Sequence, residues 1–331
     1  MQNTINKLYA QQDLTQEEAY ELFDQIIKGS LDPLILSSVL TALKIKGEVP
    51  TEIAGAASAL VDNAAAFPTP DYDFADIVGT GGDGQNTINI STTSAFVAAA
   101  CGLKVAKHGN RSVSSKSGAS DLLSQMDITL DMAPEKSRAA LDNLGVCFLF
   151  APLYHSGFRH AGPVRQALKT RTIFNILGPL INPAHANLEL MGVYDPNLIR
   201  PIAETMVNLG IKHAFVVHGT GLDEVAIHGT TQVAEIKNGI ISEYQLNPRD
   251  FGLDTYRLED IKGGTPAENK LITEAILQGK GTSAQMASVA ANTALLMCLF
   301  GKTDLKANAQ EALDMMATGK PLSILKSLAT Y

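Results

Sequence analysis

Cysteine is scarce in this chain, and its scarcity argues against a disulfide-stapled fold. Only three of the 331 residues are cysteine: Cys101, Cys147 and Cys298. They are odd in number, widely spaced and set in apolar surroundings, whereas a disulfide framework needs paired cysteines in an oxidising compartment. We therefore expect buried free thiols in a cytoplasmic protein, with neither a redox role nor a metal-binding role.

Long hydrophobic runs are also missing, which argues against a membrane protein. The most apolar stretch of helical length, residues 284–300, contains Gln285, Ser288, Asn292 and Thr293, so we expect a core helix and no membrane span. The first twenty residues show no basic segment followed by an apolar run, so we expect no secretory signal. The length allows one large domain and a smaller one.

Acidic residues are absent from two windows of an otherwise acidic chain. The formal net charge is −8, yet residues 84–120 contain no Asp or Glu, and neither do the residues between Asp142 and Glu189. A local basic window suits a small anion, because a polyanion favours a broad basic face. The two windows predict two anionic ligands, or one ligand held from two parts of the chain. Their basic residues include Lys104, Lys107, Arg111 and Lys116 in the first window, and Arg159, Arg165, Lys169, Arg171, His155 and His160 in the second.

A glycine-rich loop lies at the start of the first window. The short apolar run Ile77-Val78 breaks into Gly79-Thr80-Gly81-Gly82-Asp83-Gly84. Glycines in that density allow positive φ and let backbone N–H groups approach a ligand closely. The pattern Gly79-x-Gly81-x-x-Gly84 matches the dinucleotide fingerprint, but residues 99–106 lack the acid expected about 20 residues later. No Gly-Lys-Ser/Thr follows either, so we expect neither a dinucleotide site nor a Walker loop.

Two further elements complete a predicted phosphate site. Asn89-Ile90-Ser91-Thr92 predicts the N-cap of an alanine-rich helix over residues 93–101, and a helix N-terminus favours a phosphate. A second short strand at residues 105–106 leads into the basic and hydroxyl-rich stretch 107–117. Together these elements predict a polyphosphate cradle. Composition alone also allows a solvated loop rich in glycine and serine.

The pattern of the chain changes from helices to alternating strands and helices. Thr15-x-x-Glu18, Asp32-Pro33 and Pro50 each predict the start of a helix in residues 1–66. After the extended hinge 67–70, strands alternate with helices, which predicts a mostly parallel sheet. Asn238-Gly239 predicts one antiparallel hairpin. The expected fold class is therefore α/β: a small all-helical domain plus a large domain with a central, mostly parallel sheet flanked by helices.

Several motifs closely resemble those of the anthranilate phosphoribosyltransferase family. They are Gly79-Thr80-Gly81-Gly82-Asp83, Asn89-Ile90-Ser91-Thr92, the stretch from Lys107 to Gly118, Arg171-Thr172-Ile173-Phe174-Asn175, Gly178-Pro179-Leu180 and Asp223-Glu224-Val225. The likeness covers nearly the whole chain in order. The sequence departs from many relatives at Ala119, where they carry serine, and at His155-Ser156-Gly157, where they carry His-Pro-Ala.

The resemblance implies an enzyme of tryptophan biosynthesis. It would transfer the phosphoribosyl group of 5-phosphoribosyl 1-diphosphate to the amine of anthranilate, with Mg²⁺ as cofactor and with two ions per monomer expected. It also implies a homodimer, and a small domain of residues 1–66 completed by about 165–187, with 67–164 and 188–331 forming the large domain.

The resemblance assigns roles to particular residues of this chain. Arg165 is expected to bind the carboxylate of anthranilate, with Gly79 and Asn110 nearby. Ser91, Asp223 and Glu224 are expected to hold the metal. Since neighbouring strand residues point to opposite faces, the two acids either lie on a turn or serve two ions, and we favour two ions. No catalytic residue is certain, although His108 is a candidate. Residues expected to bind the phosphoribosyl donor are Gly79, Gly82, Asp83, Thr87, Asn89, Ile90, Ser91, Thr92, Lys107, His108, Gly109, Asn110, Arg111, Ser112, Val113, Ser114, Ser115 and Ala119.

Two alternative functions share the expected fold. A pyrimidine nucleoside phosphorylase also reacts at an anomeric carbon, but it needs one phosphate where this chain offers a diphosphate-sized set of loops and paired carboxylates. A nucleic-acid-binding relative without activity would show a basic stripe on its helical domain. Residues 1–66 instead hold nine acids and four lysines. We therefore expect no nucleic-acid partner and no membrane association.

Overall fold

Four helices form the N-terminal part of the chain, and local signals set where they begin. The Thr15 hydroxyl accepts the N–H of Glu18, whose carboxylate accepts the N–H of Thr15, so the predicted capping box is present. Asp32 caps the next helix through the N–H of Leu34. Each predicted helix is confirmed, and one more precedes them. The four are α1 (Gln2–Tyr9), α2 (Gln16–Ile27), α3 (Pro33–Lys46) and α4 (Pro50–Asp62).

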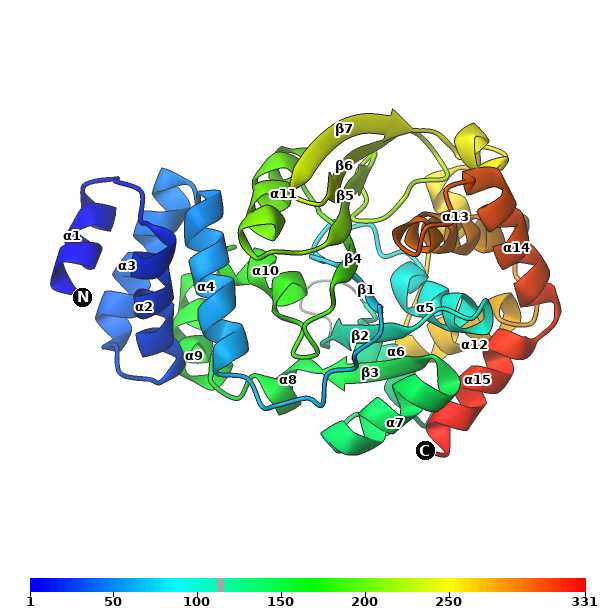
Figure 1. Ribbon diagram of the computed structural model, residues 1–331, viewed down its shortest axis with the longest axis horizontal. Coiled ribbons are helices and arrows are strands. Elements are labelled where there is room, and N and C mark those ends of the chain that lie inside the picture. The colour runs from blue at the N-terminus through cyan, green and yellow to red at the C-terminus, as the bar shows by residue number, and fades with distance from the viewer. Residues whose placement is uncertain (112–115) are drawn as a thin grey trace.

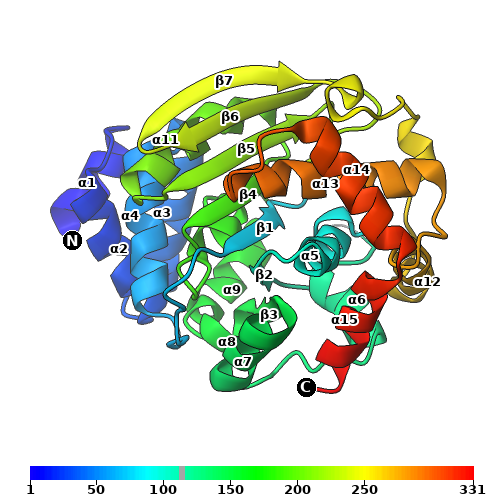
Figure 2. The same ribbon diagram turned by 45° about the vertical axis from the view of Figure 1, so that its right-hand side comes forward.

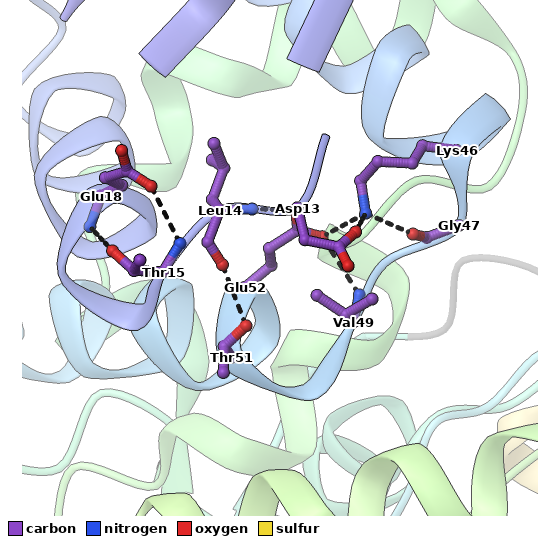
Figure 3. Close-up of polar contacts among 9 residues, drawn as sticks. All are labelled: Asp13, Leu14, Thr15, Glu18, Lys46, Gly47, Val49, Thr51 and Glu52. Atoms are coloured by element: carbon purple, nitrogen blue, oxygen red, sulfur yellow. Dashed lines mark hydrogen bonds and ion pairs between the residues drawn. The ribbon is translucent and has the colours of Figure 1, made fainter. Parts of the chain in front are cut away.

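A buried ion pair joins the loops of this helical region. The carboxylate of Glu52, in the first turn of α4, has no solvent exposure and accepts the N–H groups of Leu14 at 2.9 Å and Val49 at 3.1 Å (Figure 3). Lys46, the last residue of α3, lies 3.0 Å from the same carboxylate and also reaches Asp13 at 2.7 Å. The α1–α2 loop and the α3–α4 loop are therefore tied to one carboxylate.

Seven strands form a single sheet in the rest of the chain. Their order is β3-β2-β1-β4-β5-β6-β7, with the first five parallel and the last two antiparallel. Asn238 and Gly239, at φ +50° and +78°, form the predicted turn between the last two. The bounds are β1 (Ala75–Gly79), β2 (Val105–Gly109), β3 (Val146–Phe150), β4 (Leu188–Gly192), β5 (His213–Gly219), β6 (Thr231–Lys237) and β7 (Ile240–Leu246).

Helices cover both faces of the sheet in the computed structural model, which describes residues 1–111 and 116–331. Helices α5, α7 and α12–α15 pack on one face, and α11 with the helical region packs on the other (Figures 1 and 2). The predicted fold class is confirmed. The α-helices are α5 (Ile90–Ala100), α6 (Ala119–Gln125), α7 (Pro134–Leu144), α8 (Ala151–Tyr154), α9 (Phe158–Leu168), α10 (Phe174–Leu177), α11 (Ile199–Asn208), α12 (Pro266–Ile276), α13 (Ser283–Leu299), α14 (Leu305–Ala317) and α15 (Lys320–Ala329). The 3-10 turns are η1 (Gly178–Ile181), η2 (Pro196–Leu198), η3 (Pro248–Phe251) and η4 (Leu258–Ile261).

Helices α9 and α10 return from the sheet to the N-terminal helices. α9 packs against α2 and α3, and α10 packs against α4. This packing agrees with a discontinuous small domain, whose boundaries stay a prediction. α10 begins at Phe174, because the side chain of Asn175 accepts the N–H of Thr172 and holds 171–173 outside the helix. Across the described ranges, no helix is both long and apolar enough to cross a bilayer.

Candidate active site

The candidate site lies where the order of strands reverses. From β1 the chain proceeds to β2 and β3 on one side, and later to β4 and β5 on the other, so the carboxyl ends of β1 and β4 flank a topological switch point. Gly79 and Gly192 end these two strands in matching register. A Cβ on Gly192 would lie 1.6 Å from the carbonyl oxygen of Asp223, and one on Gly79 would lie 2.3 Å from its carboxylate. Both strands must therefore end in glycine so that the loop after β5 can reach the switch point.

That loop places two carboxylates in the site. Asp223 accepts the N–H of Gly81 at 2.6 Å, and Glu224 accepts the N–H of Ser91 at 3.2 Å. Both acids lie on a turn after β5, outside any regular strand. Burial raises the pKa of Asp223 to about 7, helped by nearby Asp83, and raises the pKa of Glu224 to about 8, helped by Asp223. A bound cation would favour the ionised forms of both groups.

The donor set fits Mg²⁺. The carboxylates of Asp223 and Glu224 are half-buried, and the N–H of Ser91 donates to Glu224. Carboxylate and hydroxyl oxygens are hard ligands, and magnesium usually combines one or two carboxylates with substrate phosphates and waters. Among the described residues, no three His, Cys, Asp or Glu side chains form a preformed metal cluster. A site that uses phosphate oxygens needs no third carboxylate.

Lys107 brings a buried positive charge next to these acids. It is 4% exposed on β2, and its ammonium donates to the carbonyl of Ile77 at 2.5 Å and to the hydroxyl of Ser91 at 3.4 Å. Burial lowers the pKa of Lys107, while Asp76, Glu224 and Asp223 oppose that shift. Lys107 and Glu224 therefore both contact Ser91 at the start of α5, Lys107 through its hydroxyl and Glu224 through its N–H.

The start of α5 differs from the sequence-based expectation. The helix begins at Ile90 instead of residue 93, and Asn89 makes no side-chain cap. The side-chain nitrogen of Asn89 donates to the carbonyl of Ser117 at 3.0 Å, and its side-chain oxygen accepts from the side chain of Asn269 at 2.8 Å. Tertiary partners therefore outcompete the local cap. Asn269, buried in α12, was missed because nothing near it in sequence marks a site.

The glycine loop offers donors without partners. Gly81, Gly82 and Gly84 have φ of +66°, +80° and +74°, which favours glycine at each position. Within the described part of the chain, the N–H groups of Gly82, Asp83 and Gly84 donate to no other group. Successive free N–H groups in such a turn form a concavity that binds anions. The predicted cradle therefore has its donors in place.

A row of rings runs from the end of β2 towards the helical region. Ring centroids are 5.3 Å apart for His108 and His155, 5.9 Å for His155 and Phe158, and 5.4 Å for Phe158 and Phe174. The guanidinium of Arg165 lies 5.1 Å above the Phe174 ring. Burial lowers the pKa of His108 to about 3 and that of His155 to about 4, so both rings are neutral at neutral pH. A neutral His108 does not donate a proton as an acid.

The other predicted site residues lie around this centre. Thr87 pairs with Lys262 in an isolated β-bridge. Ile90 and Thr92 are buried, so all three predicted residues are fixed in the fold. Gly109 ends β2 with no room for a side chain, because a Cβ would lie 2.9 Å from Phe148.

The end of the β2 loop is anchored on α6. The carbonyl of Asn110 accepts the N–H of Ser120 at 3.4 Å, and Arg111 pairs with Asp121 at 3.6 Å. Ala119 is the first residue of α6. Four predicted donor-binding residues lie outside the described residues: Ser112, Val113, Ser114 and Ser115.

Known proteins resemble this chain over its whole length. A glycosyl transferase family helical bundle domain matches residues 2–64, and a glycosyl transferase family a/b domain matches residues 71–322. An anthranilate phosphoribosyltransferase of Photobacterium profundum is 70% identical over 98% of this chain and 96% of its own. That of Vibrio parahaemolyticus is 68% identical over 100% of both chains.

Solved structures agree with these relatives. An anthranilate phosphoribosyltransferase from Thermus thermophilus superposes with a TM-score of 0.94 at 38% identity, covering 99% of this chain and 98% of that one. The enzyme from Saccharomyces cerevisiae in complex with PRPP and Mg gives a TM-score of 0.90 at 31% identity, covering 99% and 96%. With its glycine loop, paired carboxylates and sheet topology, the chain belongs to the anthranilate phosphoribosyltransferase family.

Proposed function

We propose that this protein transfers the phosphoribosyl group of 5-phosphoribosyl 1-diphosphate to the amine of anthranilate, a step of tryptophan biosynthesis. The observation that carries the proposal is that the free loop N–H groups of residues 82–84 and the half-buried acids Asp223 and Glu224 lie together at the switch point. Relatives of full length and high identity are named anthranilate phosphoribosyltransferase.

The chain's residues suit the charges that develop in this reaction. The bond from the anomeric carbon to the diphosphate oxygen breaks, a bond to the anthranilate nitrogen forms, and the amine proton leaves to solvent or diphosphate. The leaving diphosphate gains negative charge, which the loop N–H groups and the buried ammonium of Lys107 stabilise in place. An aromatic amine is neutral near pH 7, so positioning replaces a strong base. Bound Mg²⁺ would neutralise charge on the diphosphate oxygens.

The proposal includes two metal ions per monomer. Asp223 is anchored on the β1 loop through Gly81, whereas Glu224 is anchored on the start of α5 through Ser91. Two carboxylates held by different elements suit two ions that share the oxygens of one diphosphate.

Arg165 is proposed to bind the anthranilate carboxylate. It is stacked on Phe174, and in the described part of the chain no acid pairs with it. Arg165→Ala is expected to raise the KM for anthranilate about tenfold or more, the effect of losing one charged hydrogen-bonding pair, and to change the KM for the donor little. Steady-state kinetics with each substrate varied measures both. Arg159→Ala, an exposed arginine of the same helix, is the control, and equal effects on both substrates would refute the role.

A homodimer formed through α1 and α3 is also part of the proposal. Leu34 is 81% exposed, Ile45 69% and Tyr9 50%, and the three line or flank one hollow between these helices. A second copy of the chain would cover this apolar face. Leu34→Asp is expected to halve the mass found by light scattering, whereas Leu271→Asp, on an exposed leucine of α12, should leave it unchanged. A monomeric wild type would end this part of the proposal.

The activity itself is tested by anthranilate fluorescence. The signal should fall only when the phosphoribosyl donor and Mg²⁺ are both present. Phosphate-dependent cleavage of thymidine or uridine, with no loss of anthranilate, would instead indicate a nucleoside phosphorylase. A cytoplasmic location belongs to the same proposal, supported by three free cysteines.

A further inference from the structure

The outer half of the glycine loop is held from outside by one distant side chain. Thr80 and Gly81 are fixed from within, through the carbonyl of Gly192 at 2.9 Å and the carboxylate of Asp223 at 2.6 Å. For the backbone of residues 82–84, the described structure gives one bond from a distant residue: the guanidinium of Arg171 donates to the carbonyl of Gly82. Arg171 therefore contacts the half of the loop that carries the free N–H groups.

Arg171 is itself held by both parts of the molecule. Its guanidinium lies 3.8 Å from the centroid of the Tyr194 ring, so the planar group stacks on the ring. Tyr194 in turn donates its N–H to the hydroxyl of Thr80 at 3.0 Å. Lys44 of α3 donates to the carbonyl of Arg171 at 2.9 Å. A continuous set of contacts thus runs from the helical region through Arg171 to the loop.

The bond to Gly82 determines the direction of the next N–H group. A trans peptide is planar, so the Gly82 carbonyl and the Asp83 N–H point in opposite directions. With the carbonyl turned towards Arg171, the Asp83 N–H points away from Arg171. At φ +80°, Gly82 has the backbone freedom to let this peptide turn over if the bond is lost.

We propose that Arg171, stacked on Tyr194, is a positioning residue that orients the Gly82–Asp83 peptide for the diphosphate of the donor. This inference rests on the proposed function and deepens it: the helical region contributes to donor binding through a residue that acts on the loop backbone. The anionic ligand class is a diphosphate or a sugar diphosphate.

The test compares Arg171→Gln with Tyr194→Leu, which removes the stacking ring and leaves every charge in place. Both variants are expected to raise the donor KM, about tenfold for Arg171→Gln and less for Tyr194→Leu, with the anthranilate KM changed little. Both should also weaken the binding of magnesium diphosphate to the enzyme, measured by calorimetry without anthranilate. Arg159→Gln, an exposed arginine with no contact to the loop, is the matched control.

Two results would overturn the positioning role of Arg171. If Arg171→Gln weakens donor binding while Tyr194→Leu binds the donor as the wild type does, Arg171 acts by charge alone and the positioning role is overturned. Equal rises in both KM values would overturn it too. Calorimetric binding of magnesium diphosphate does not require turnover, so a wild type that lacks the proposed activity is recognised separately.

Discussion

Asp223→Asn combined with Glu224→Gln is expected to lower kcat/KM by about 100-fold or more, as does loss of a charge-stabilising group in other active sites, and to remove most of its response to Mg²⁺. The amides keep the shape of both side chains and still accept the N–H groups of Gly81 and Ser91, so the loops should stay in place. Activity measured over a magnesium titration shows the effect. Asp254→Asn with Glu259→Gln, two exposed acids, makes the same change in net charge and is the control.

The pH dependence of folding stability gives a second test of the roles of Asp223 and Glu224, and the direction of the expected change follows from their pKa values. Burial raises the folded-state pKa of Asp223 to about 7 and of Glu224 to about 8, above the ordinary values of 3.8 and 4.5. As pH rises from about 4 to about 8 the unfolded chain loses these protons first, so these two groups cost the metal-free protein stability in that window. Amides do not titrate there, so the loss should shrink in the double variant. Thermal unfolding with a chelator at pH 5 and pH 8 compares the two proteins. Undiminished Mg²⁺ dependence would rule out the assignment.

Glu52→Ala is expected to destabilise the protein by about 3–5 kcal/mol, because it breaks a buried ion pair and leaves two N–H groups without an acceptor. The Lys46 ammonium, 6% exposed, keeps only the exposed carboxylate of Asp13 as an ionic partner, and the N–H groups of Leu14 and Val49 lose their acceptor. Those groups lie in two different loops, so the helical region is expected to loosen as a unit. The midpoint of urea unfolding measures the effect.

Two further variants separate the buried pair from a simple loss of charge. Glu311→Ala breaks the pair with Lys302, whose side chains are 40% and 39% exposed, and should cost about 1 kcal/mol or less. Glu52→Leu with Lys46→Leu removes both buried charges and should recover part of the stability lost in Glu52→Ala. Similar midpoints for Glu52→Ala and Glu311→Ala would show that the buried network carries no special weight.

Local interactions explain what could be predicted of the fold. Some structural signals depend only on residues at most three positions apart, so a short stretch of sequence is enough to predict them. They are the Thr15–Glu18 capping box, the Asp32 cap and the Asn238-Gly239 turn. Buried strands such as β3, Val146–Phe150, are apolar throughout, which is a pattern that a short stretch of sequence shows by itself. Fold class therefore follows from the order of such elements.

The sequence by itself determined many of the elements, the fold class and the types of residue available for the site: glycines, lysine and adjacent acids. Only the tertiary structure decided how they meet. Asp223 reaches the glycine loop because Gly79 and Gly192, far apart in sequence, end neighbouring strands. Asn89 leaves its expected cap for Asn269, and Arg171 reaches Gly82 across 89 positions of the chain. Such contacts depend on which strands become neighbours in the sheet, and local propensity carries no information about that choice.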